Sequence, residues 1–141
     1  MKFITVLLTS LFLFSFGCSS TENTASNGNI QILNASYDSW SHPPMGSSDV
    51  PEVGTDLKIT VKNWDTQYTP VYIIYNSRKS VSATVSDTVD GDTVITGKII
   101  RSSSKLPKTS ETVSKSDRLV YSNQEGKQSY IEINNWESSK N

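Results

Sequence analysis

The stretch from Gly54 to Tyr75 constrains the fold most, because its two patterns are those of β-strands. From Leu57 to Lys62 apolar residues alternate with polar ones, which is the period of a strand with one buried face and one face in water. After a polar segment that ends at Pro70, residues 71–75 are apolar or aromatic without interruption. Such a run is typical of a central strand covered on both faces. Together the two patterns predict a small β-sandwich.

Further strand and turn signals occur along the rest of the chain. Strands are expected at residues 30–37, 81–85, 93–100, 118–121 and 130–133. Asp90-Gly91 lies between two of these runs and predicts a hairpin, because both residues tolerate the positive φ of a type I′ turn. Residues 101–117 show no pattern and are expected to form a long mobile crossing. No window has helical periodicity of useful length, so almost no helix is expected.

About seven short strands with regularly spaced turns are typical of an immunoglobulin-like sandwich. Residues 54–64 (GTDLKITVKNW) resemble the second strand of bacterial immunoglobulin-like and fibronectin type III domains, and residues 117–121 (DRLVY) are similar to a tyrosine-corner strand. The resemblance implies an all-β fold: a single antiparallel immunoglobulin-like sandwich over residues 30–136, followed by a polar tail at 137–141. A jelly roll or another small sandwich is the alternative.

The N-terminal segment carries the most specific signal. Lys2 supplies a positive charge, residues 4–16 form an apolar run, and Gly17 precedes Cys18, the only cysteine. The run is too short to cross a bilayer as a permanent helix. It resembles the signal peptide of bacterial lipoproteins, which implies that residues 1–17 are removed and that Cys18 is lipidated. The alternative is an ordinary secretory signal, with a free thiol left in an oxidising compartment.

The lipoprotein resemblance also implies a location and a first partner. A lipidated Cys18 would hold the protein to a membrane of the bacterial cell envelope, and Ser19 in the next position favours the outer membrane. Residues 18–29 are polar and read as a flexible tether. The remaining expected partners are an envelope protein or a glycan. The formal net charge of −1 argues against nucleic acid, whose binders carry a strongly basic face.

The candidates for catalysis and metal binding are few. His42 is the only histidine, and no recognisable catalytic pattern surrounds it, so neither an enzyme nor a cofactor is expected. His42 and Met45 are possible copper(I) ligands. They lie in the segment Trp40–Met45, which its prolines predict to be a fixed loop. This loop gives the alternative function, a periplasmic carrier of a small ligand or a copper-type metal.

A second candidate metal site lies at the predicted hairpin. Asp87, Asp90 and Asp92 bring three carboxylates near one turn, and calcium prefers clustered oxygen ligands. Their spacing does not match the EF-hand loop, and a solvated hairpin tip is the alternative interpretation.

The best functional hypothesis rests on aromatic residues. Trp40, Tyr68, Tyr72 and Tyr75 come from the first strand region and the central strand, and they form the candidate binding surface. The outer face of strand 71–75 needs a cover, which is either the segment from Trp40 to Pro51 or a partner molecule. Aromatic rings of this kind could stack on sugars. The sequence therefore favours a lipid-anchored envelope protein that acts as a non-catalytic binding or structural accessory module.

Overall fold

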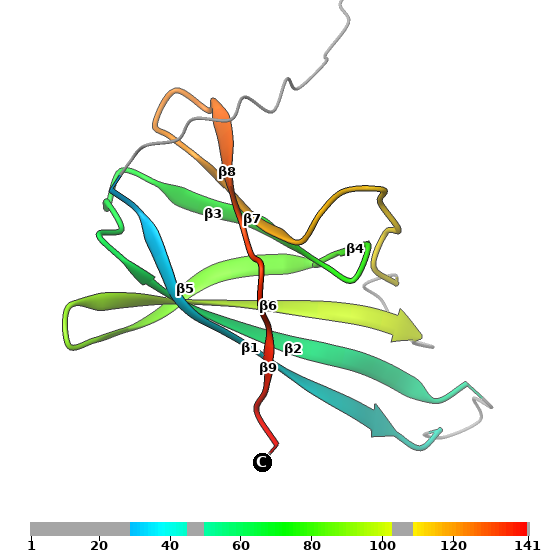
Figure 1. Ribbon diagram of the computed structural model, residues 1–141. Coiled ribbons are helices and arrows are strands. Elements are labelled where there is room, and N and C mark those ends of the chain that lie inside the picture. The colour runs from blue at the N-terminus through cyan, green and yellow to red at the C-terminus, as the bar shows by residue number, and fades with distance from the viewer. Residues whose placement is uncertain (1–28, 45–49, 103–108, 141) are drawn as a thin grey trace, which may run out of the picture.

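The computed structural model describes residues 29–44, 50–102 and 109–140 (Figure 1). These residues form two β-sheets and no helix, so none of them belongs to a helix long and apolar enough to cross a membrane. Cys18, Met45 and most of the expected tether lie outside the described residues. The predicted all-β fold is confirmed.

Sheet A contains five strands in the order β5-β6-β2-β1-β9. Its strands are β5 (Ser82–Val89), β6 (Asp92–Ser102), β2 (Glu52–Lys62), β1 (Gln31–His42) and β9 (Glu137–Ser138). All neighbours are antiparallel except β1 and β9, which pair in parallel. Gln31 pairs with Lys62 at one end of the β1–β2 ladder and His42 with Glu52 at the other.

Sheet B contains four antiparallel strands in the order β4-β3-β7-β8. They are β4 (Arg78–Lys79), β3 (Thr69–Tyr75), β7 (Arg118–Ser122) and β8 (Gln128–Glu132). Strands β1, β2, β6 and β5 therefore form one sheet, and strands β3, β7 and β8 form the other. This is the ABED and CFG arrangement of an immunoglobulin-like sandwich, with β4 and β9 as short additions.

The core lies between the two sheets and follows the alternation in the sequence. Leu57, Ile59 and Val61 of β2 are at most 1% exposed and face sheet B. Ile73 of β3 and Leu119 of β7 meet them from the other layer and are fully buried. The even-numbered residues of β2 therefore point away from the core, to the outer face of sheet A.

The predicted Asp90-Gly91 hairpin is confirmed. Val89 pairs with Asp92, and the two residues between them have φ values of 52° and 85°. Positive φ at both positions is the requirement of a type I′ turn, whose twist matches that of the two strands. Asp and Gly meet this requirement at low cost.

The outer face of sheet B is covered by its own cationic side chains. Ile74 and Val120 point outward there yet are 1% and 0% exposed. Tyr72 and Tyr130 are the register partners on either side of Val120. The Lys79 ammonium lies 4.4 Å from the ring centroid of Tyr72, and the Arg118 guanidinium lies 4.0 Å from that of Tyr130. Cation–π contacts of this kind cover part of the face.

The structure differs from three expectations about the ends of strands. Residues 40–42 do not leave the sheet, because β1 continues to His42 opposite β2. This part of the expected cover does not fold across sheet B, and residues 45–49 lie outside the described ranges. The expected polar tail begins with a strand instead: β9 follows the crossing from β8 and lies beside β1 (Figure 1). The Ser139 amide also donates to the Tyr37 carbonyl at 2.9 Å, so backbone pairing holds a segment that has no apolar pattern.

The predicted crossing at 101–117 is the third correction. β6 continues through Ser102, and the described residues 109–117 are hydrogen-bonded to both sheets. The buried Ser110 accepts from the Ile100 amide through its hydroxyl at 2.8 Å and donates to the Ile100 carbonyl through its own amide at 2.6 Å. Arg78 forms a β-bridge with Thr112. The Ser110 hydroxyl thus accepts the hydrogen bond that a neighbouring strand would otherwise accept from the Ile100 amide. A hydrophobic pattern in the sequence does not predict this contact.

Candidate binding site on the outer face of sheet A

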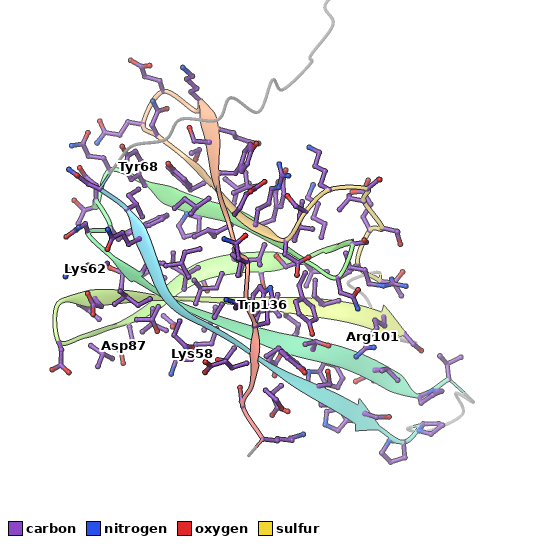
Figure 2. The ribbon with its side chains drawn as sticks, viewed as in Figure 1. Lys58, Lys62, Tyr68, Asp87, Arg101 and Trp136 are labelled. Carbon is purple, nitrogen blue, oxygen red and sulfur yellow. The ribbon has the colours of Figure 1, made fainter. Side chains whose placement is uncertain are left out.

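The four aromatic residues predicted to form one surface are separated by the fold. Trp40 lies on the outer face of sheet A and Tyr72 on the outer face of sheet B. Tyr75 faces the interior, and Tyr68 lies at the end of the sandwich opposite Arg101 (Figure 2). The sequence could not separate them, because each position depends on which face of which sheet a residue occupies.

Tyr68 belongs to an aromatic cluster that closes one end of the sandwich. Its ring centroid lies 5.0 Å from that of Tyr121 and 5.9 Å from that of Trp64, both in edge-on geometry. Burial, followed by the neighbouring Tyr68, raises the pKa of Tyr121, and a hydrogen bond with Ser129 opposes that shift. The cluster is structural, because its rings pack on one another.

Tyr75 packs between Tyr37 and Trp136 at the edge of the core. The ring centroids lie 5.4 Å from Tyr37 and 4.9 Å from Trp136. Burial raises the pKa of Tyr75, and Tyr37 and Asp117 raise it further, while Arg101 lowers it. These ring contacts make Tyr75 part of the packing at the edge of the core.

Trp40 is the one predicted residue whose setting suits a ligand. It stands directly opposite Gly54 in the β1–β2 ladder. A Cβ built on Gly54 would lie 2.2 Å from Cζ2 of Trp40 and 2.7 Å from the Ile99 carbonyl oxygen. The indole therefore rests on the bare backbone of β2, which only glycine leaves free. The ring is half-buried, so part of it stays accessible beside this contact.

Two side chains flank the seated indole. The imidazole of His42 lies 4.9 Å from it, centroid to centroid, with the planes tilted by 33°. The Lys98 ammonium lies 5.6 Å from the centroid of a Trp40 ring and 3.6 Å from the Asp56 carboxylate. The Trp40 Nε1 atom is buried and has no hydrogen-bond partner among the described residues.

A groove of about 400 Å³ lies on sheet A, and its lining includes Lys98, which flanks Trp40. Its lining includes Asp38, Asp56, Leu57, Lys58, Ser82, Thr96, Gly97, Lys98 and Ser139. The Lys140 ammonium also lies 2.8 Å from the Asp38 carboxylate and 3.0 Å from the Ser39 carbonyl oxygen. Acids and bases alternate along the groove without a dominant sign. We call Trp40, His42, Lys98, Asp56 and Asp38 the Trp40 face.

The predicted metal ligands are not gathered by the described part of the fold. In residues 29–44, 50–102 and 109–140, no group of three or more His, Cys, Asp or Glu could hold a metal ion. Asp87, at the register shift of β5, accepts from the Thr88 amide at 2.7 Å. His42 stacks on Trp40, and the copper pair with Met45 stays a prediction because Met45 lies outside the described ranges.

The chain matches no protein-family model, no curated protein and no solved structure. The site is therefore argued from its geometry alone. Sequence reasoning found Trp40 and His42 but missed Gly54, Lys98 and Asp56. An isolated glycine in a strand is a signal for close approach of another group, and it could have pointed to the seat of the indole.

Proposed function

We propose that this protein is a lipid-anchored envelope protein, acylated at Cys18, that binds a glycan through the Trp40 face and performs no catalysis. The observation that carries the proposal is the seating of Trp40 on Gly54. An aromatic ring fixed on a rigid sheet offers a flat apolar platform at little cost in conformational entropy.

The flanking groups support a saccharide over a strongly charged ligand. Asp56 and Lys98 already form an ion pair at 3.6 Å, and Asp38 forms one with Lys140 at 2.8 Å. Within each pair the two charges neutralise each other, while lone pairs and N–H groups remain that can hydrogen-bond to the hydroxyls of a sugar. An apolar platform beside a few oriented polar groups is the usual composition of a small-ligand site.

The test is binding of soluble polysaccharides, both neutral and acidic, measured by calorimetry on the full chain and on three variants. Trp40→Ala should abolish binding, and Trp40→Phe should retain part of it because a ring remains on the seat. Tyr72→Ala is the matched control, since it removes an aromatic from the opposite sheet. Full binding by Trp40→Ala, with an unchanged circular dichroism spectrum, would refute the site.

The anchoring is tested separately. Mass spectrometry of the purified protein should show acyl chains on Cys18, and Cys18→Ser should move the protein from the membrane fraction to the soluble fraction. An unmodified thiol at that position would end the proposal of a lipid anchor without touching the binding site.

A further inference from the structure

The outer edge of β5 has an unusual surface for an edge strand. In the described part of the chain no strand pairs with this edge. Of the five large apolar side chains most exposed among the described residues, three lie at this edge: Val81 at 40%, Val85 at 48% and Val89 at 48%. Natural edge strands are usually protected by lysine, proline or a bulge. Between Val81 and Val85 the chain has none of these.

The segment from Val81 to Val85 has nearly the same sequence when it is read in either direction. Its residues are Val81-Ser82-Ala83-Thr84-Val85. If this segment pairs antiparallel with a second copy of itself about Ala83, valine faces valine, serine faces threonine and alanine faces alanine. Pairs of β-branched residues and Ser–Thr pairs stabilise adjacent strands. The register shift between Val85 and Asp87 ends the regular segment, so the self-complementary part is also the part that can pair.

The charges at the two ends of the segment favour the same arrangement. Arg78 and Lys79 precede it, and Asp87, Asp90 and Asp92 follow it. Antiparallel pairing places the basic end of one copy beside the acidic end of the other, at two symmetric positions. A parallel pairing would place like charges together, which costs free energy.

We propose that two copies of this chain associate edge to edge through β5, with a twofold axis at Ala83, so that the two A sheets become continuous. Such an interface is isologous and closes after two copies. A single strand pair buries less area than a stable dimer requires, so the dimer is weak and forms at high local concentration. The inference does not depend on the Trp40 face or on glycan binding.

The register is tested by disulfide trapping in full chains that carry Cys18→Ser. Pairing about Ala83 places Ser82 of one copy opposite Thr84 of the other, so a mixture of Ser82→Cys and Thr84→Cys chains should form a mixed disulfide on oxidation. Either variant alone should form little, because its cysteines would then be diagonal neighbours beyond disulfide reach. A mixed product no more abundant than the single-variant products would overturn the proposal.

The strength of the contact is tested by analytical ultracentrifugation over a range of concentrations. Val85→Lys should weaken self-association on the order of tenfold, because it removes two symmetric valine pairs. Val89→Thr is the control: the side chain of Val89 has the same exposure but lies beyond the register shift, and the change adds no charge beside the aspartates, so association should persist. A monomer at every concentration, or equal loss in both variants, would refute β5 pairing.

Discussion

Replacing Gly54 by alanine is the most direct test of how sheet A is packed. The added Cβ would meet Cζ2 of Trp40 at 2.2 Å, Cε2 of Trp40 at 2.7 Å and the Ile99 carbonyl oxygen at 2.7 Å. Real Cβ atoms do not approach heavy atoms so closely. The indole can swing away, but the Ile99 carbonyl belongs to the β6 backbone and cannot move without disturbing the ladder.

The expected cost follows from these contacts. Overfilling a packed site typically destabilises a protein by about 1–3 kcal/mol, and for a domain of this size that lowers the midpoint of thermal unfolding by roughly 5–15 °C. Trp40→Ala in the same chain removes two of the three contacts and leaves the carbonyl. The cost of Gly54→Ala should therefore fall by about 1 kcal/mol in that background, which is a coupling energy of usual size for residues in contact.

The assay is urea unfolding followed by circular dichroism, for the wild type, both single variants and the double variant. Lys58→Ala, at an exposed position on the same face of β2, provides the control and should change stability by less than about 0.5 kcal/mol. If Gly54→Ala is as stable as the control, the indole does not rest on Gly54, and the argument for the Trp40 face fails with it.

Three further outcomes are expected. Gly97→Ala should cost less than Gly54→Ala, because its closest neighbour, at 2.7 Å, is the terminal Cδ1 of Ile73, which can rotate; equal costs in urea unfolding would contradict this. Burial raises the pKa of Tyr121 in the folded protein. The contribution of the protonated phenol to the free energy of unfolding is therefore fully present below the unfolded pKa of about 10, and it is lost as pH rises through the folded pKa. The free energy of unfolding should therefore fall less between about pH 8 and about pH 11 in Tyr121→Phe than in the wild type, and equal slopes would refute the assignment. Arg118→Lys should destabilise by about 1 kcal/mol, because an ammonium does not reproduce the planar stacking on Tyr130 or the donation from Nε to the Ser116 carbonyl at 3.1 Å; Lys127→Arg is the control.

The local patterns in the sequence predicted the strands well where a single rule decides the structure. The alternation from Leu57 fixes one face of β2, and Asp90-Gly91 fixes a turn of two residues. Both signals lie within a few neighbouring positions of the chain. The all-β fold and its sandwich architecture follow from summing such signals, and the structure confirms them.

The contacts between sheets and across strands could not be predicted in the same way. The sequence gives no reason for Lys79 to lie on Tyr72 or for Arg118 to lie on Tyr130, because each pair meets only after β3, β4, β7 and β8 have assembled. The seat of Trp40 depends on the register that places it opposite Gly54. The sequence therefore predicted the central aromatic residue of the candidate site, Trp40, but not the residues of the neighbouring strands that surround it.

The length of β1 has a geometric consequence for what the protein can reach. The chain enters the sandwich at Gln31, and Trp40 lies nine positions further along the same strand, a distance of about 30 Å at the rise of an extended strand. Gln31 and Trp40 therefore lie near opposite ends of one strand. If Cys18 is acylated, the length of β1 would add to the reach of the expected flexible tether, and the Trp40 face would then be able to meet polymers that lie well beyond the bilayer surface.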